Sequence, residues 1–226
     1  MIISIMQPTF MPWAGYFHMI KNSDLFIFLD DVQFNKRSWQ QRNKFLQLQN
    51  EIYLTVPVNS KGKFNQKIND EKINHEQEWK DKHLKVFEYN YKKHPFFNEV
   101  FNLITTAYNK DFNELYKLNI FLIDLVKEYL SIKVETKLSS QFNITSTKGD
   151  RIIDLLKANG ATKYLSPNGS KDYLNEGKIF KENNIELKYL DYKCLPYRQL
   201  NNKKFISHLS IMDAIFNLGT ETKEVL

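Results

Sequence analysis

The chain has 226 residues, of which 42% are hydrophobic, so it is long and apolar enough to fold as one domain with a C-terminal elaboration. Its formal charge of +6 comes from 32 basic and 26 acidic side chains that are dispersed along the chain. This pattern suits phosphate-bearing small molecules and lacks the dense basic tract of a nucleic-acid groove. The single cysteine, Cys194, excludes a disulfide scaffold. We expect no membrane span and no signal peptide, because no apolar run approaches about 20 residues and no basic segment precedes the first one.

Two short apolar runs near the start of the chain predict buried strands around a short helix. Residues 2–6 and 25–29 are apolar on both faces, as parallel strands covered by helices tend to be. Between them, residues 13–22 show helical spacing of apolar side chains. A third strand is predicted over 52–58, followed by a long polar surface loop over 59–74.

Helices dominate the middle of the chain, and a second α/β segment follows. The periodicity predicts helices over 76–91, 96–109, 113–130, 147–158, 171–182 and 210–217, with strands over 162–165 and 185–190. This alternation predicts an α/β fold with a mostly parallel, Rossmann-like sheet, flanked by helices and carrying a helical insertion between its two halves. We expect a single domain over 1–226, in which 1–75 is a βαβ unit, 76–132 the helical segment and 133–226 the second α/β half.

Polar residues follow four of the predicted strands directly. They are Gln7-Pro8, Asp30-Asp31, residues 166–170 and Asp191-Tyr192. Right-handed crossovers bring the carboxyl ends of parallel strands to one edge of the sheet, which is where ligands of open α/β sheets bind. We therefore expect these strand ends to surround one cleft.

Two acidic residues and one histidine are candidates for catalysis. Asp30 and Asp31 could bind Mg²⁺, hold a sugar hydroxyl or act as a base, although neighbouring residues at a strand end point to opposite sides. The structural alternative is a capped turn. His83 lies on a predicted helix and is a reserve candidate for the general base. The alternative, which is more common for such a histidine, is a partly buried packing role.

An arginine- and tryptophan-containing segment follows the acidic pair. Arg37 and Arg42 suit bidentate binding of a phosphate or carboxylate, Trp39 suits stacking on a ring, and Asn43 offers a hydrogen-bond donor. This composition predicts a binding loop for an anionic ligand. A surface helix whose arginines pair with nearby acids is the alternative.

Two predicted helix starts offer backbone donors for an anion. Trp13 and Tyr16 open the first helix, and Ser166 and Asn168 lie in the turn before a later one. The alternatives are a plain core helix and a capping turn. The five histidines show no metal-binding spacing, and the chain has no Walker A or dinucleotide-binding motif.

These motifs together resemble the WbqC-like family of bacteria. The resemblance is carried by Gln7-Pro8-x-x-x-Pro12-Trp13-x-Gly15-Tyr16-Phe17, Leu29-Asp30-Asp31-Val32-Gln33-Phe34, Arg37-Ser38-Trp39-x-x-Arg42-Asn43 and Leu54-Thr55-Val56-Pro57-Val58, and later by Tyr164-Leu165-Ser166, Tyr173-Leu174 and Phe205 with Leu209-Ser210-Ile211-x-Asp213. It runs nearly from end to end. One departure is Pro167-Asn168, where a glycine is expected soon after the serine.

The resemblance implies a cytoplasmic bacterial protein associated with loci for lipopolysaccharide O-antigen or other surface polysaccharides. It also implies modification of amino sugars, for instance by acyl or aminoacyl (glycyl) transfer. No residue-level catalytic assignment comes with it.

The leading hypothesis is a transferase that acts on the amine of a nucleotide-linked sugar. Arg37, Arg42 and a helix N-terminus would hold the diphosphate, Asp30 or Asp31 would be the base, and Asn43 or Gln7 would stabilise the oxyanion. The donor would be an acyl thioester or an aminoacyl compound, and Mg²⁺ is not excluded. The alternatives are a non-catalytic binding or scaffold protein of the same pathway, and an ATP-dependent ligase or nucleotidyltransferase. The aromatic content is compatible with a homodimer.

Overall fold

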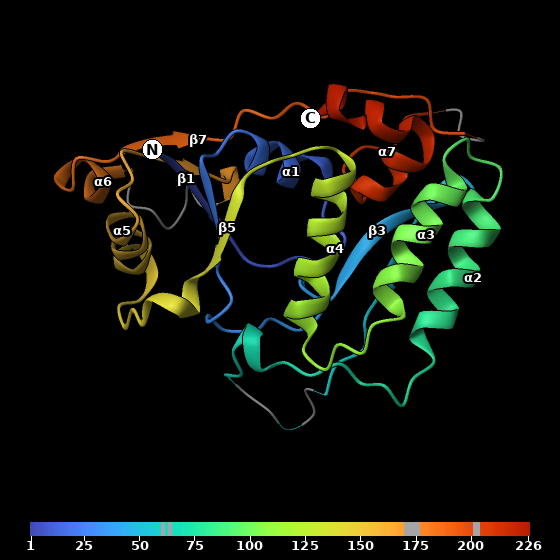
Figure 1. The fold of residues 1–226 in the computed structure, drawn as a ribbon, viewed down its shortest axis with the longest axis horizontal. Coiled ribbons are helices and arrows are strands. Elements are labelled where there is room, and N and C mark those ends of the chain that lie inside the picture. Colours follow the sequence, from blue (N-terminus) through green and yellow to red (C-terminus); the bar gives the residue numbers. More distant parts are fainter. Residues whose placement is uncertain (60–61, 63–64, 170–176, 201–203) are drawn as a thin grey trace.

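A five-stranded parallel sheet forms the centre of the protein (Figure 1). The computed structural model describes residues 1–59, 62, 65–169, 177–200 and 204–226. In spatial order the strands are β5 (Glu135–Leu138), β2 (Leu25–Phe28), β1 (Ile2–Met6), β6 (Lys163–Ser166) and β7 (Glu186–Tyr189). Each neighbouring pair is parallel. The predicted α/β class with a parallel sheet flanked by helices is confirmed.

Helices cover both faces of this sheet. On one face α1 (Ala14–Lys21) and α4 (Leu115–Tyr129) pack against Phe26, Phe28 and Leu165. On the other face α5 (Lys148–Ala158) and α6 (Lys178–Glu182) pack against a separate apolar cluster that contains Ile3, Ile5, Leu25 and Ile27. β1 and β2 are therefore apolar on both sides because both sides are buried, as their uninterrupted apolar sequences predict.

The described part of the insertion between β2 and α4 contains a hairpin, a short 3-10 helix and two α-helices. The hairpin consists of β3 (Arg42–Gln47) and β4 (Asn50–Thr55), followed by the short helix η1 (Ile68–Asp70), α2 (Trp79–Tyr91) and α3 (Phe97–Tyr108). The strand predicted over 52–58 is thus observed at Asn50–Thr55, and it pairs antiparallel with β3 outside the main sheet. The sequence did not predict β3, because the charged and amide residues around Phe45 leave no apolar run or regular alternation there.

The remaining elements follow the predictions with shifts of a few residues. α5 begins after Thr147, whose side chain makes no capping hydrogen bond, and α7 (Ile211–Leu218) begins after Ser210, whose hydroxyl accepts from the Met212 N–H. Of the helix predicted over 171–182, the structure describes α6, while residues 170–176 lie outside the described part. The edge strand β5 was missed because it is short, polar and only partly buried. In the described part of the chain, no helix combines the length and apolarity needed to cross a membrane.

The strand order creates a switch point between β1 and β6. The chain leaves β1 toward α1 on one face of the sheet, whereas β6 is followed by α6 on the opposite face. The two connections diverge at the carboxyl ends of these strands. In open α/β sheets such a divergence is the position where a ligand is expected.

Candidate functional site

A cavity of about 280 Å³ lies where β1 ends. Its walls come from the end of β1 and the following loop, from the start of α1, from the segment that contains β3 and from the loop before α7. The lining residues are Met6, Thr9, Trp13, Tyr16, Trp39, Asn43, Lys44 and His208. Four of the predicted binding residues, Trp13, Tyr16, Trp39 and Asn43, therefore share one cavity at the expected edge of the sheet.

Trp13 is held in this wall by a glycine two residues later. A Cβ atom on Gly15 would lie 2.3 Å from Cη2 of the Trp13 indole, so the ring occupies the space that a side chain would need. The indole also contacts the Tyr192 ring at a centroid distance of 5.3 Å and the His208 ring at 5.1 Å. Gly15 therefore makes room for the indole.

Two buried amides fix the loop that follows β1. Nδ2 of Asn43 donates to the carbonyl oxygens of Phe10 and Met11, both at 3.0 Å. Nδ2 of Asn119 on α4 donates to the carbonyl oxygen of Pro8 at 3.1 Å. Because both amide hydrogens of Asn43 are bound to the backbone, this side chain shapes the cavity and has none left for an oxyanion.

Gln7 lies in the sequence between two residues that line the cavity, Met6 and Thr9, but does not line it itself. Its Oε1 accepts from Nε2 of Gln40 at 2.7 Å, and its backbone carbonyl accepts from the Tyr16 hydroxyl at 3.0 Å. Within the described part of the chain, the Nε2 of Gln7 makes no hydrogen bond. Burial raises the pKa of Tyr16 well above its ordinary value, so its hydroxyl stays protonated.

A cation–aromatic stack extends outward from the cavity along the hairpin. Trp39 is 50% exposed, and its ring centroid lies 6.1 Å from that of Tyr53 on β4. The guanidinium of Arg42 lies over the Tyr53 ring, 4.4 Å from its centroid. Arg37 is exposed in a left-handed backbone conformation and does not line the cavity. The structure thus joins Arg42 to Trp39 and leaves Arg37 apart.

Lys44 supplies a positive charge to the cavity wall. Its Nζ lies 2.6 Å from Oε2 of Glu51 on the neighbouring strand. The hydrogen bond to Glu51 raises the pKa of Lys44, which keeps its ammonium group protonated.

The predicted catalytic acids lie at the end of β2 and are held by internal hydrogen bonds. Asp30 is 1% exposed and accepts from the Ser140 N–H at 3.0 Å, from the Ser140 hydroxyl at 2.8 Å and from the Ser139 hydroxyl at 3.0 Å. Asp31 forms an ion pair with Arg151 of α5 and shares the single hydroxyl hydrogen of Ser139 with Asp30. Both carboxylates anchor η2 (Ser139–Phe142) and α5 to the sheet, and neither lines the cavity.

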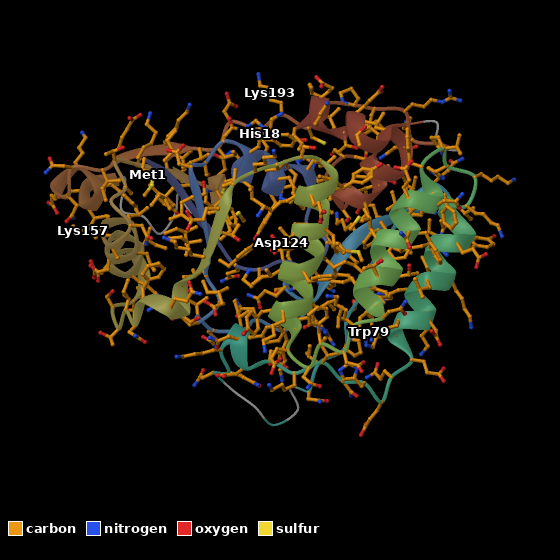
Figure 2. The ribbon with its side chains drawn as sticks, in the orientation of Figure 1. Met1, His18, Trp79, Asp124, Lys157 and Lys193 are labelled. Atoms are coloured by element: carbon orange, nitrogen blue, oxygen red, sulfur yellow. The ribbon has the colours of Figure 1, made fainter. Side chains whose placement is uncertain are left out.

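His83 is buried on α2, away from the two acids. Its Nδ1 lies 2.9 Å from the Tyr108 hydroxyl, and its ring packs edge-on against Trp79 at 5.2 Å. Burial lowers its pKa to about 4, so it is neutral at physiological pH. Figure 2 places Trp79, at the start of α2, on the opposite side of the molecule from Lys157 on α5. The hydrogen bonds of His83 and those of the two acids thus involve different parts of the chain.

The other two predicted binding residues are Ser166, the last residue of β6, and Asn168 in the turn after it. Ser166 is fully buried, and Nδ2 of Asn168 donates to the Leu190 carbonyl oxygen at 2.8 Å. This hydrogen bond ties the end of β6 to the end of β7. Neither residue lines the cavity at β1.

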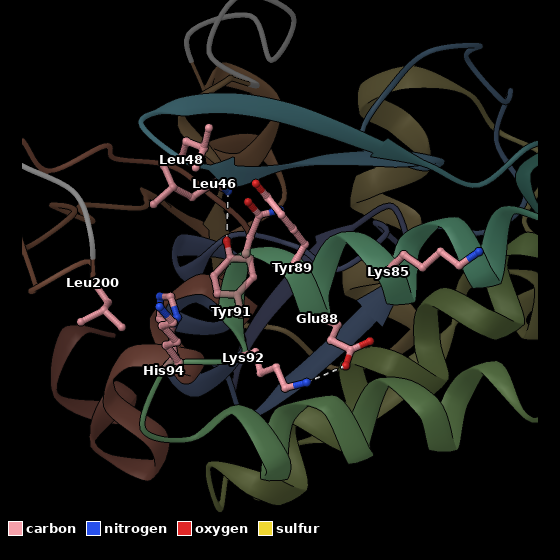
Figure 3. Close-up of a pocket in the computed structure, with 11 residues that line it drawn as sticks. Leu46, Leu48, Lys85, Glu88, Tyr89, Tyr91, Lys92, His94 and Leu200 are labelled. Carbon is pink, nitrogen blue, oxygen red and sulfur yellow. Dashed lines mark hydrogen bonds and ion pairs between the residues drawn. The ribbon is translucent and has the colours of Figure 1, made fainter.

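A larger cavity of about 610 Å³ lies between the tip of the hairpin and the end of α2 (Figure 3). Its walls include Leu46, Leu48, Tyr91, Lys92 and His94. None of the predicted site residues lines it. Lys92 pairs with Glu88 of the same helix at 3.0 Å, and it stands at a helix C-terminus, where a cation is favourable and a ligand anion is not. This region is therefore the weaker candidate.

The sequence did not point to Met6, Thr9, Lys44 or His208 as site residues. The first two flank Gln7 and Lys44 follows Asn43, so proximity to predicted residues could have found them. His208 has no such local signal, because its contact with Trp13 joins segments almost two hundred residues apart. Among the described residues, no three His, Cys, Asp or Glu side chains form a group that could hold a metal ion.

Comparison with known proteins supports the resemblance seen in the motifs. The family model of the WbqC-like protein family matches residues 7–225. A relative from Mycobacterium tuberculosis (strain ATCC 25618 / H37Rv), described as uncharacterized protein Rv1507c, is 32% identical over 226 residues, which is 99% of this chain and 96% of that protein. No solved structure matches significantly. The chain belongs to the WbqC-like protein family.

Proposed function

We propose that this protein is a transferase that binds a nucleotide-linked amino sugar in the cavity at β1 and modifies the sugar amine, as a step in the synthesis of a bacterial surface polysaccharide. The observation that supports this most is the cavity itself. It lies at the ligand edge of a parallel sheet and combines two indole rings, Trp13 and Trp39, with the ammonium group of Lys44.

The parts of such a ligand match the parts of the site. Indole rings stack on a nucleobase or on the apolar face of a sugar. The charges of Lys44 and Arg42 suit a diphosphate. A volume of about 280 Å³ suits the sugar portion, and the nucleotide would extend over the exposed Trp39 and Tyr53.

The second substrate would be an acyl or aminoacyl thioester. Amine acylation needs a bound donor, a proton acceptor and a group that stabilises the oxyanion. The Nε2 of Gln7 is a suitable oxyanion donor, since it makes no hydrogen bond within the described residues. Asp30, Asp31 and His83 are instead given structural roles in this proposal, because their side chains are already engaged.

One observation favours a second candidate, a binding protein of the same pathway that lacks catalysis. The two predicted catalytic carboxylates are held by internal partners and do not line the cavity. Such a protein would bind the same ligand saturably and show no turnover with any thioester. Product analysis with both substrates present separates the two functions.

Thermal-shift and calorimetric titration test the proposed ligand class. A panel of UDP-, GDP-, CMP- and dTDP-linked sugars, including UDP-glucosamine and assayed with and without Mg²⁺, should contain a ligand that stabilises the protein by about 2.7 kcal/mol at 100 times its Kd. Trp39→Ala should weaken that binding at least about tenfold. Tyr89→Ala is the matched control, because Tyr89 is an aromatic residue that is 75% exposed and lines the larger cavity instead of the cavity at β1. Failure of every nucleotide sugar to bind would refute the proposal.

A further inference from the structure

His208 forms part of the cavity wall from an unusual backbone position. Its φ is +60°, in the left-handed region that residues other than glycine seldom adopt. Such conformations persist where the surrounding structure holds them, and they concentrate at functional sites.

Hydrogen bonds and ring contacts hold the imidazole over the cavity. Its Nδ1 lies 2.8 Å from the Ser207 hydroxyl. Its ring lies 5.1 Å from the Trp13 indole, with an angle of 32° between the ring planes. Just after it, the Ser210 N–H donates to the Lys44 carbonyl oxygen at 2.9 Å, which ties this loop to β3. In the tautomer whose Nδ1–H donates to the Ser207 hydroxyl oxygen, Nε2 keeps the lone pair that can accept a proton from a ligand.

The loop before His208 is anchored on a buried carboxylate of α7. Asp213 is fully buried and accepts from the Tyr197 hydroxyl at 2.6 Å and from Nε2 of Gln199 at 3.1 Å. The Gln199 side chain also accepts from the Ile206 N–H at 2.9 Å. Two residues before His208, the backbone is thus attached to the protein core.

Three side chains that can exchange a proton line the cavity, among the residues described. Tyr16 and Lys44 both have raised pKa values, the first through burial and the second through its bond to Glu51. Both hold their protons at neutral pH. The remaining group is the imidazole of His208, whose two ring nitrogens can accept and donate a proton.

We propose that Nε2 of His208 accepts the proton of the sugar amine during transfer, which rests on the proposed function. The amine nitrogen forms a bond to the thioester carbonyl carbon and loses a proton to Nε2. The carbon–sulfur bond then breaks, and the departing thiolate takes the proton from the imidazolium. The products are the amide and the free thiol, with no net change in His208.

Chemical rescue tests this role. His208→Gly adopts a φ of +60° without strain and leaves an imidazole-sized space. With UDP-glucosamine and acetyl- or glycyl-coenzyme A as probes, we expect it to bind the nucleotide sugar within a few-fold of wild type and to lose about 10²–10⁴-fold in kcat. Added imidazole should restore a substantial part of that loss. His208→Asn, which tolerates the left-handed backbone, should lose the same activity and show less rescue.

The outcomes separate this inference from the proposed function. A matched control is His75→Asn, because His75 is an exposed histidine outside the cavity and should keep wild-type turnover. Wild-type turnover together with an equally active His208→Gly would overturn the role of His208 and leave the transferase standing. Saturable sugar binding by the wild type without turnover would overturn both the role of His208 and the transferase. Loss of activity without imidazole rescue would reduce His208 to a positioning residue and contradict proton transfer.

Discussion

The substitution Gly15→Ala tests how the cavity wall is built. The added Cβ would lie 2.3, 2.5 and 2.7 Å from three atoms of the Trp13 indole, so the ring must move by about 1 Å to restore ordinary contact. Because Trp13 also packs on Tyr192 and His208, the movement disturbs the wall that this indole forms. Overpacking of this kind typically destabilises by about 1–3 kcal/mol, against a gain of up to about 1 kcal/mol from replacing a helical glycine.

The matched control is Gly149→Ala at the second residue of α5, the same helical position that Gly15 has in α1. Its Cβ would meet only Cδ1 of Ile179, at 3.9 Å. We expect the control to be neutral or slightly stabilised and Gly15→Ala to melt roughly 5–10 °C below it, since about 1 kcal/mol corresponds to 2–4 °C at this chain length. Thermal unfolding followed by circular dichroism measures the difference. Equal melting temperatures would refute the assigned role of Gly15.

Three further predictions concern the structural roles of Asp31 and His83 and the ring stack at Tyr53. Asp31→Ala should lower the free energy of unfolding by about 3 kcal/mol, because it leaves Arg151 largely buried without its carboxylate; a urea titration that finds wild-type stability would contradict the structural role. Burial lowers the pKa of His83 to about 4, below the value of about 6.5 in an unfolded chain. As the pH drops, the unfolded state therefore binds a proton before the folded state does, and the free energy of unfolding decreases. His83 should therefore account for a loss of about 2 kcal/mol between pH 7.5 and pH 5, and His83→Gln should remove that part of the pH dependence in parallel urea titrations. Tyr53→Ala removes the ring between Trp39 and Arg42 and should weaken nucleotide-sugar binding several-fold by calorimetry, whereas Tyr53→Phe keeps the stack and should bind as the wild type does.

The sequence predicted the parts of the fold whose signal is local. β1 and β2 are short apolar runs, and α4 has a regular apolar stripe, so periodicity was sufficient for each. β3 and β5 were missed because both mix charged residues with few apolar ones; β3 becomes a strand through its hairpin with β4, and β5 through pairing with the distant β2. Tertiary context overrides weak strand propensity at such positions.

The candidate site was predictable only where its residues cluster in the sequence. Trp13, Tyr16, Trp39 and Asn43 lie in two dense motifs, and the structure places all four around one cavity. The sequence Asp30-Asp31 does not reveal whether the two carboxylates are free to bind a ligand or already hydrogen-bonded within the protein. The partners that engage Asp30 lie about 110 residues further along the chain, so no local pattern could reveal them.

The central claim is that the cavity at the end of β1 is the ligand site, and a crystal structure of the protein with the tightest-binding nucleotide sugar tests it most directly. We predict the sugar between Trp13, Trp39 and His208, with the diphosphate near Lys44 and Arg42. A ligand bound instead in the larger cavity beside His94, with the cavity at β1 left empty, would contradict it.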